Sequence, residues 1–343
     1  MDKIRMKDIS AEVWNQLLDK IKGASFAYTA ESILFQITYA NLVIANESYI
    51  MMRDKKPIAC VCLYITENKN ERTISWNGRY CPAPLIDHDL SYKTQEKVCK
   101  EIMEDIQQIE ENYACIKTMF KFEPIGNPEH LCKIENYNYL IKYGYNDTSS
   151  LTQVLDLRLD QETLYQEVTQ NHKRGIKKGL KYEIEFLDKD SVTLEDVKEY
   201  KDIYEYDAGM VTRNSELWEQ YYMFIKAGFG ILGFAKKDGK RVATVIVTKY
   251  KNTAYYSSYA EKTDCLDGIT VGHKLHWEMI LDLKKRGIEF YEMGEQVFGN
   301  YPKGTEDAKL VNISKFKRGF GGYTVPIFRG IKNVKQVKAC TQQ

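Results

Sequence analysis

Apolar side chains recur at helical spacing along much of the chain. In residues 10–21, Val13, Leu17 and Ile21 are four residues apart, so they share one face of a helix that Ser10 can cap. The same kind of pattern predicts further helices over residues 29–40, 92–111, 161–180, 194–206, 216–227 and 271–286. Short apolar runs between turn residues predict strands over residues 48–53, 58–65, 76–81, 114–122, 151–157, 230–236, 242–250, 253–259 and 288–293.

The order of these elements is repeated. Helices, hairpins, a helix and a strand occur before residue 144, and the same succession occurs again after residue 150. The segment between them, Gly-Tyr-Asn-Asp-Thr-Ser-Ser, is polar and rich in turn residues, as domain boundaries often are. We therefore expect a duplicated α+β domain, with one copy over residues 1–146 and the other over residues 147–322.

The composition excludes several classes of protein. The 49 basic and 48 acidic residues among 343 nearly cancel, so no general attraction to DNA or to an anionic membrane is expected. No stretch approaches the ~20 apolar residues of a membrane span, and the first residues lack the apolar core of a signal peptide. The eight cysteines form no Cys-x-x-Cys pair and the five histidines do not cluster with them, so we expect reduced thiols, no metal site and a cytoplasmic location.

Three motifs of the second half are more specific. The first is the helical stretch Tyr-Gln-Glu-Val-Thr-Gln-Asn-His-Lys-Arg-Gly-Ile-Lys-Lys-Gly over residues 165–179. The second is the helix-to-strand unit ending Glu-Met-Gly at residue 294, and the third is Ile-Ser-Lys-Phe-Lys-Arg-Gly-Phe-Gly-Gly over residues 313–322. In this order and spacing they resemble the Fem family of peptidyltransferases. The resemblance covers most of the chain and is thin before residue 145.

The resemblance implies a fold and an activity. Fem proteins have two GNAT-type acyltransferase domains in tandem, so we expect an α+β fold with a mixed central sheet flanked by helices in each domain. The tail, residues 323–343, is expected to join the first domain. The family includes enzymes that build peptidoglycan cross-bridges with aminoacyl-tRNA, and relatives in surface-glycan pathways that use acyl-CoA. Either molecule is therefore a candidate donor, and no other cofactor is implied.

The resemblance also implies roles for individual residues. Phe316 and Lys317 match the catalytic Phe-Lys pair of the family, whose lysine stabilises developing negative charge. Arg213 matches an arginine that helps to hold a diphosphate-bearing acceptor. Tyr256 and Tyr259 fall on the strand whose tyrosines line the acceptor cleft. On the plain alternation of a strand, the tyrosines at residues 255–259 are distributed over both of its faces.

In the first half, Glu123 resembles an acidic residue that precedes a proline at the end of a strand, and it is a candidate general base. Gln36 lies near the place where relatives that bind a nucleotide-linked muropeptide have a lysine, which weakens the case for the same diphosphate acceptor. The long helical arm of some tRNA-using members has no room in residues 188–212. The glycines of residues 267–273 are too widely spaced for the pyrophosphate loop of acetyl-CoA enzymes, which counts against ordinary CoA binding.

Each candidate residue also has a plainer interpretation. Lys317 can stabilise a tetrahedral oxyanion, and Gly319, Gly321 and Gly322 beside it allow close approach and positive φ, but a solvated Lys-Arg pair before a turn is the alternative. Lys173, Lys177 and Lys181 can contact donor phosphates, but they can also form a merely solvated helix face.

The function expected from the sequence is transfer of an aminoacyl or acyl group to an amine of a cell-envelope precursor. The acceptor is a peptidoglycan precursor, lipid-linked or soluble, or an activated amino-sugar. Aminoacyl-tRNA is favoured as the donor because the glycine-rich loop is missing, while the neutral charge and the absent arm argue against it. An acyl-CoA-dependent N-acetyltransferase is the alternative. A catalytically silent protein that binds a glycan or a nucleotide-sugar is the second alternative.

Overall fold

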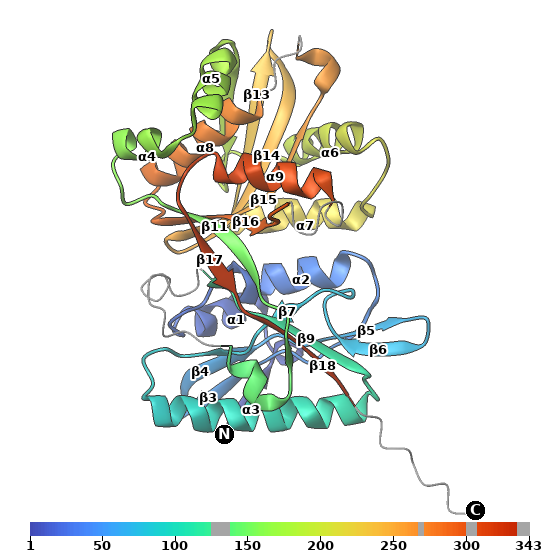
Figure 1. Ribbon diagram of the computed structural model, residues 1–343. Helices are drawn as coiled ribbons and strands as arrows, with labels where there is room; N and C mark the ends of the chain where they lie inside the picture. The colour runs from blue at the N-terminus through green and yellow to red at the C-terminus, as the bar shows by residue number, and fades with distance from the viewer. Residues whose placement is uncertain (125–137, 267–270, 300–306, 335–343) are drawn as a thin grey trace, which may run out of the picture. The chain divides into compact units, whose positions relative to one another are not determined.

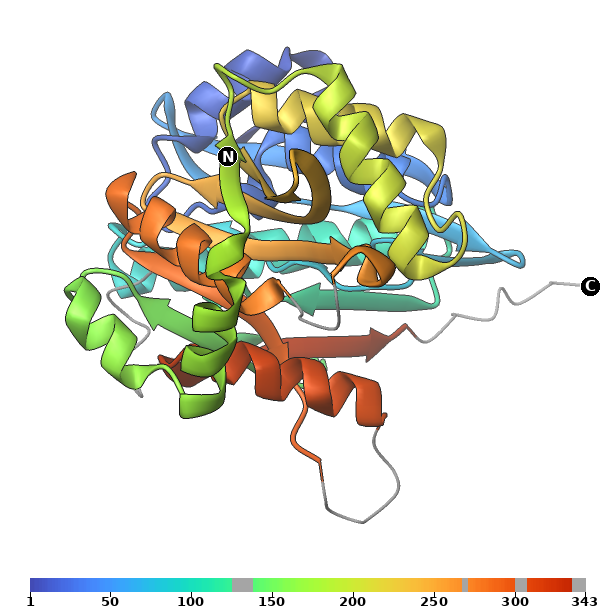
Figure 2. The same cartoon turned by 90° about the horizontal axis from the view of Figure 1, so that it is seen from above.

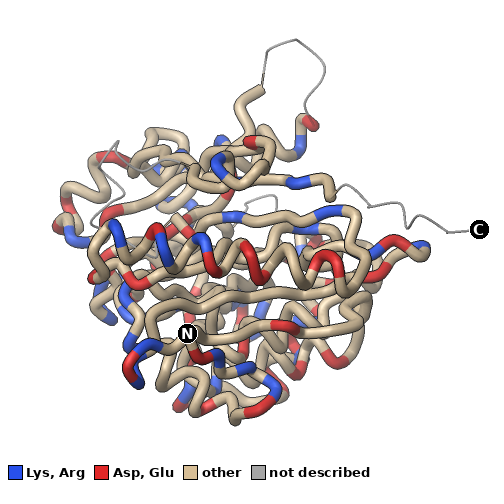
Figure 3. Tube along the Cα trace, turned by 90° about the horizontal axis from the view of Figure 1, so that it is seen from below, with Lys and Arg blue, Asp and Glu red and all other residues tan. Residues whose placement is uncertain are grey.

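The computed structural model describes residues 1–124, 138–266, 271–299 and 307–334 (Figure 1). These residues divide into two compact units, of which the first is Met1–Ser149 with the chain from Ile327 onwards and the second is Ser150–Pro326. Basic and acidic positions are interspersed along the chain (Figure 3), in line with its nearly neutral balance of charge. Among the described residues, no helix is both long and apolar enough to cross a membrane.

The first unit contains two sheets. The smaller has the strand order β1-β3-β4-β8, made of β1 (Asp2–Arg5), β3 (Tyr49–Arg53), β4 (Lys56–Val61) and β8 (Leu85–Ile86). The larger has the order β10-β18-β9-β6-β5-β2, with β7 also paired to β9; its strands are β2 (Val43–Asn46), β5 (Tyr64–Asn68), β6 (Glu71–Ile74), β7 (Cys81–Pro82), β9 (Lys117–Lys121), β10 (Asn146–Asp147) and β18 (Arg329–Asn333). The α-helices of this unit are α1 (Ala11–Leu18), α2 (Ala30–Thr38) and α3 (Tyr92–Asn112).

The second unit has one mixed sheet of the order β12-β13-β14-β15-β16-β11-β17. Its strands are β11 (Ser150–Asp156), β12 (Glu183–Leu187), β13 (Gly230–Lys237), β14 (Lys240–Tyr250), β15 (Thr253–Glu261), β16 (Phe290–Gln296) and β17 (Tyr323–Ile327). Its α-helices are α4 (Gln161–Glu167), α5 (Gln170–Lys178), α6 (Leu194–Ala208), α7 (Ser215–Lys226), α8 (Gly272–Lys285) and α9 (Ala308–Arg318).

Alternation along the central strands explains the layers of the second unit. On β13, Ile231 belongs to the core that also takes in Leu164 of α4, Ile176 of α5 and Leu275 of α8, whereas Leu232 does not. Successive side chains of a strand point to opposite faces. Helices α4, α5 and α8 therefore cover one face, and α6 and α7 cover the other (Figures 1 and 2).

The two units share an arrangement of four strands and a helix, although β11 precedes its hairpin in the chain and β18 follows its own. In the second, β14 and β15 form a hairpin, α8 follows, β16 pairs parallel to β15, and β11 pairs antiparallel to β16. In the first, β5 and β6 form the hairpin, α3 follows, β9 pairs parallel to β6, and β18 pairs antiparallel to β9. The predicted fold class, α+β with mixed sheets flanked by helices, is confirmed. The domain boundaries at residues 146 and 322 stay a prediction.

Two of the predicted strands are wrong in detail. The apolar run of residues 58–65 is two strands, β4 and β5, because the chain passes from one sheet to the other at Cys62 and Leu63, both fully buried. Residues 76–81 were predicted as a strand, but Asn77 and Gly78 have φ of 47° and 79°, so the chain turns there and only Cys81 begins a strand.

The helix predicted over residues 161–180 is two helices. Asp160 caps α4, accepting a hydrogen bond from the amide of Thr163 at 2.8 Å. The helix ends at Glu167, because Val168 has an extended conformation with a ψ of 130°, and α5 begins after Thr169. Apolar periodicity continues across the break because Leu164, Val168 and Ile176 all reach the same core. The strand β12 was not predicted.

Candidate functional site

The parallel strands β15 and β16 separate partway along their length. They pair only over residues 253–255 and 290–292, although β15 continues to Glu261 and β16 to Gln296. Past this point their facing edges have no ladder partner among the described residues. In the first unit, the equivalent strand β9 pairs with β6 at Thr118 and then with β7 at Phe120, so β7 covers the equivalent edge. The described part of the second unit therefore has an open edge that the first unit has closed.

A β-bulge in β15 arranges the tyrosines beside this edge. Tyr256 is opposite Val247 and Ser258 is opposite Ile246, so Ser257 is an extra residue. The bulge brings Tyr256 and Tyr259 to the same side, where their ring centres lie 5.0 and 5.4 Å from that of His276 in α8. In a strand without the extra residue, alternation would put these two tyrosines on opposite faces.

Lys317 lies in the last turn of α9, and its ammonium lies beside the open edge. The Nζ atom is 5.4 Å from the centre of the Tyr256 ring. A Cβ atom on Gly294 of β16 would lie 2.8 Å from that Nζ, and Gly294 itself has a φ of 95°, which favours glycine. Burial lowers the pKa of Lys317, and the carboxylates of Glu292 and Glu295 oppose the shift. A cation with little hydration at this position can stabilise a developing oxyanion strongly.

Phe316 is surrounded by three imidazole rings. Its ring centre lies 5.3 Å from that of His172, 5.1 Å from that of His273 and 5.2 Å from that of His276. Burial lowers the pKa of all three, to about 4 for His273 and to about 3 for His276, so the rings are neutral at pH 7. Within the described residues, no group of three or more His, Cys, Asp or Glu side chains could hold a metal ion. The sequence alone did not reveal this cluster, since His172 is about a hundred residues from the other two.

Arg213 lies in a cage of aromatic rings. The carbon of its guanidinium is 3.9, 5.2 and 5.1 Å from the ring centres of Tyr204, Trp218 and Tyr221, and Nη1 donates to the hydroxyl of Tyr200 at 3.0 Å. Its Nε has no hydrogen-bond partner among the described residues. The helical spacing of the four aromatic residues could have signalled the cage. The phosphate-holding role implied by the resemblance stays a prediction.

A carboxylate occupies the start of α8. Glu261, at the end of β15, accepts a hydrogen bond from the hydroxyl of Tyr259 and another from the amide of Val271, which precedes the first residue of α8. Burial raises the pKa of Glu261, and the nearby carboxylate of Asp207 raises it further. The amides at a helix N-terminus attract anions, so this carboxylate stands where an external phosphate would otherwise be drawn.

The structure places Gln36 and Glu123 in the first unit. Gln36 is buried in α2, where its amide nitrogen donates to Ser32 at 3.1 Å while Oε1 has no partner among the described residues. Glu123 follows β9 and forms an ion pair with Lys121, with 3.2 Å between Nζ and Oε1. Neither contact tests the role predicted for the residue, and both roles stay predictions.

The three basic residues proposed for donor binding lie on two elements. Lys173 and Lys177 are on α5, but Lys181 belongs to the 3-10 turn Gly179–Lys181 beyond it. The ammonium of Lys173 donates to the carbonyl of Gln166 at 3.1 Å, and Lys177 is exposed. The single helical face predicted for all three is therefore wrong for Lys181, because the helix ends at Lys178.

Known proteins resemble the chain in part of its sequence and in its fold. Residues 167–309 match the family model of an acetyltransferase (GNAT) domain. The crystal structure of FemX superposes with a TM-score of 0.67 at 10% sequence identity, covering 96% of this chain and 97% of that chain. The C-terminal domain of a protein from Agrobacterium fabrum, described as a lysylphosphatidylglycerol synthetase, has a TM-score of 0.59 at 12% identity, with 94% and 93% covered. No curated protein sequence matches significantly.

Proposed function

We propose that the chain is a Fem-like acyltransferase and that it transfers an aminoacyl group from aminoacyl-tRNA to an amine of a cell-envelope precursor, which the match of residues 167–309 to a GNAT acetyltransferase domain and the FemX-like fold support. The observation that carries the proposal is the half-buried ammonium of Lys317 beside the open edge of β15 and β16. The acceptor is a peptidoglycan precursor or an activated amino-sugar. The proposed location is the cytoplasm, where aminoacyl-tRNA is made.

The ammonium supports a definite step. The acceptor amine attacks the ester carbonyl, a C–N bond forms, and negative charge develops on the carbonyl oxygen. The C–O bond to the ribose then breaks, and the proton lost by the amine ends on the departing hydroxyl. Lys317 stabilises the oxyanion, while Glu292, which is buried and accepts from Thr152 at 2.9 Å, favours the charged form of the lysine. From the resemblance alone, Glu123 is proposed as the general base that takes the proton from the amine and passes it to the departing ribose oxygen.

The carboxylate at the start of α8 favours the tRNA donor. A pyrophosphate drawn to those amides would meet Glu261 and Asp207, so a donor held there by its pyrophosphate is disfavoured. The ester of an aminoacyl-tRNA requires no phosphate at that position, and Lys173, Lys177 and Lys181 offer charges for the backbone of the RNA. The match to an acetyltransferase domain favours acyl-CoA instead, which is the second candidate donor.

The acceptor is assigned from the remaining residues. Tyr256 and Tyr259 share the face of β15 beside Lys317, and Arg213 retains an unpartnered Nε among the described residues. These are the proposed acceptor contacts of the second unit, and Gln36 of the first unit is proposed as an acceptor contact from the resemblance alone. The name of one structural neighbour, a lysylphosphatidylglycerol synthetase, describes a product in which an amino acid is joined to a lipid, and this is consistent with a lipid-linked acceptor.

The test is transfer by the purified chain. A mixture of radiolabelled aminoacyl-tRNAs and labelled acetyl-CoA are offered separately, each with nucleotide-linked muropeptides and amino-sugar nucleotides as acceptors. We expect amide product with aminoacyl-tRNA. Lys317→Ala should lower kcat more than tenfold, since loss of an oxyanion contact costs about 3 kcal/mol, whereas Lys315→Ala, at an exposed position in the same helix, should not. Product from neither donor would leave a binding protein as the better interpretation.

A further inference from the structure

The end of α9 is tied to the start of α5. The last turn of α9 is closed by its own backbone, since the amide of Gly319 donates to the carbonyl of Phe316 at 3.1 Å. A carbonyl oxygen has a second lone pair, and Nε2 of His172 lies 2.8 Å from this same oxygen, while the amide of Thr169 donates to the carbonyl of Gly319 at 2.9 Å. Residues of α5 and of its N-cap therefore contact two carbonyl groups at the end of the helix that carries Lys317.

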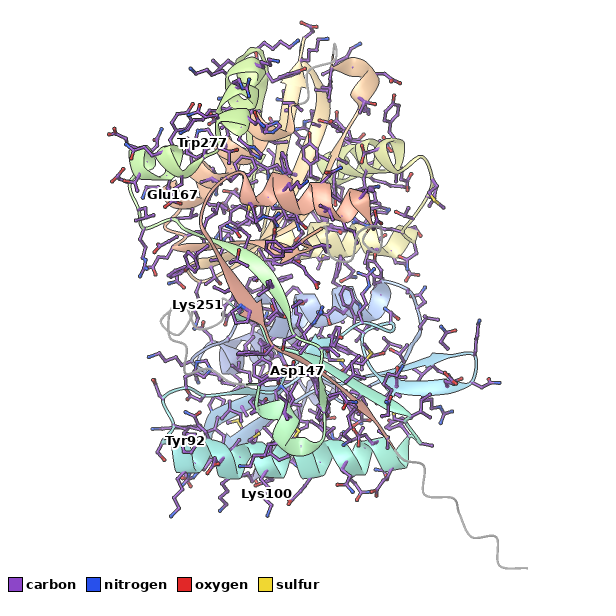
Figure 4. All side chains as sticks on the ribbon, in the orientation of Figure 1. Tyr92, Lys100, Asp147, Glu167, Lys251 and Trp277 are labelled. Atoms are coloured by element: carbon purple, nitrogen blue, oxygen red, sulfur yellow. The ribbon has the colours of Figure 1, made fainter. Side chains whose placement is uncertain are left out.

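A third bond joins the same two regions. The carboxylate of Glu167, the last residue of α4 and labelled in Figure 4, accepts from the amide of Gly322 at 2.9 Å. Gly321 and Gly322, with φ of 96° and 74°, form the turn that follows α9. The junction between α4 and α5 thus holds both the last turn of α9 and the turn after it.

The protonation of His172 follows from its partners. A carbonyl oxygen only accepts hydrogen bonds, so Nε2 bears the hydrogen. Nδ1 is 3.0 Å from the hydroxyl of Thr169, which can donate to it, and the ring is therefore the neutral Nε2–H tautomer. Burial lowers the pKa of His172, with the bond to Phe316 opposing, which agrees with a neutral ring at pH 7.

The position of the His172 ring is also set by packing. A Cβ atom on Gly319 would lie 2.0 Å from Cε1 of His172, so the ring fills the space that this glycine leaves. On its other sides, its centre is 4.5 Å from that of His273 and 4.8 Å from that of Phe320. A ring so confined has one orientation in which to donate.

We propose that His172 is a positioning residue for the transfer reaction. The Phe316 carbonyl is part of the peptide plane that joins Phe316 to Lys317, so holding that oxygen fixes the backbone from which the Lys317 side chain extends. A shift of about 1 Å at a reacting group can cost on the order of a hundredfold in rate. The inference rests on the proposed function of Lys317, and it makes the start of the basic helix α5 part of the support of the catalytic residue.

The test compares two substitutions of His172. His172→Phe keeps a ring but removes the donor, and kcat should fall at least about tenfold while KM changes little. His172→Gln can place an amide N–H near the position of Nε2 and should recover much of the loss. Lys284→Met is the matched control, because it removes bonds of 2.9 and 2.7 Å to the carbonyls of Leu157 and Leu159 elsewhere in the second unit. Its kcat should match that of the wild type.

A second readout does not depend on turnover. The rate at which an amine-reactive ester labels Lys317, measured by peptide mass spectrometry against Lys315, should rise in His172→Phe and return towards the wild type in His172→Gln. If the wild type transfers from neither donor, the proposed function fails, and the labelling still tests the positioning. If the folded His172→Phe protein keeps its kcat and its labelling rate, or if His172→Gln is no better than His172→Phe in either, His172 has no positioning role.

Discussion

Acid should destabilise the second unit through His276. This side chain has no exposed surface, and neither ring nitrogen has a hydrogen-bond partner among the described residues. Burial, and then the charges of His273, Lys317 and His172, lower its pKa to about 3, whereas a histidine in the unfolded chain has a pKa of ~6.5. The folded state therefore remains unprotonated at His276 as the pH falls through 6.5, while the unfolded state takes up a proton.

The size of the effect follows from the two pKa values. The stability contributed by neutral His276 is present above pH ~6.5 and is lost as the pH falls towards about 3. At pH 5 the solution is roughly 1.5 pH units below the pKa of the unfolded histidine, and each unit stabilises the unfolded state by ~1.4 kcal/mol through proton uptake. The folded state takes up almost no proton at this pH, so it gains almost no free energy. The free energy of unfolding should therefore fall by about 2 kcal/mol between pH 7 and pH 5 through this residue alone.

Hydrogen exchange measured on peptides of α8 reports the opening of this unit separately from the other. The opening free energy of the wild type is compared with that of His276→Phe at pH 7 and at pH 5, after correction for the intrinsic pH dependence of exchange. His172 and His273 are present in both proteins, so their titration cancels in the difference. We expect the wild type to lose about 2 kcal/mol more than the variant. An equal loss in both proteins would mean that His276 is solvated or paired, which would refute the argument.

Two further predictions concern charges elsewhere. Lys332 pairs with the buried carboxylate of Glu110 at 2.7 Å, so its removal leaves a buried charge without a partner. Lys332→Met should therefore lower the free energy of unfolding of the first unit by about 3–5 kcal/mol in chemical denaturation, whereas Lys3→Met, at the more exposed pair with Asp105, should lower it by less than about 1 kcal/mol. The double variant with Glu110→Gln should recover the stability lost in Lys332→Met. If aminoacyl-tRNA is the donor, replacement of Lys173, Lys177 and Lys181 by alanine should reduce the slope of log K for donor binding against log salt concentration by roughly 2 to 3. Activity should return at high donor concentration. Equal slopes for the wild type and the variant would mean that these lysines are only solvated.

Local features were predictable because they depend on neighbouring residues. Ser10 caps its helix as predicted, and Asp160 caps α4 in the same way. The turn between β13 and β14 uses Asp238 and Gly239 at positive φ, and Gly287 follows α8 with a φ of 80°. These are choices between a few backbone conformations within one or two turns of chain, so the residue types alone decide them.

Features that depend on distant partners were not predictable. The Ser257 bulge exists only relative to the register of β14, and without it Tyr256 and Tyr259 would not share a face. The three histidines meet because α5, α8 and α9 pack together, which no spacing between them encodes. Residues 58–65 were predicted as one strand but belong to two, because a chain that passes between two sheets in the interior is apolar throughout and shows no break in its pattern.

The glycines around Lys317 illustrate the difference most directly. The sequence indicated that glycines after Lys317 permit close approach and positive φ, and Gly321 and Gly322 do have positive φ. Gly319, however, has a φ of −63°, which any residue can adopt, and its requirement comes from the His172 ring that occupies the place of a Cβ. Gly294, on β16, has a φ of 95°, so its backbone conformation accounts for this glycine whatever lies beside it. A solvated lysine before a turn would have an exposed ammonium, whereas burial lowers the pKa of Lys317 and its Nζ lies 5.4 Å from the centre of the Tyr256 ring, which favours a functional ammonium over the solvated alternative.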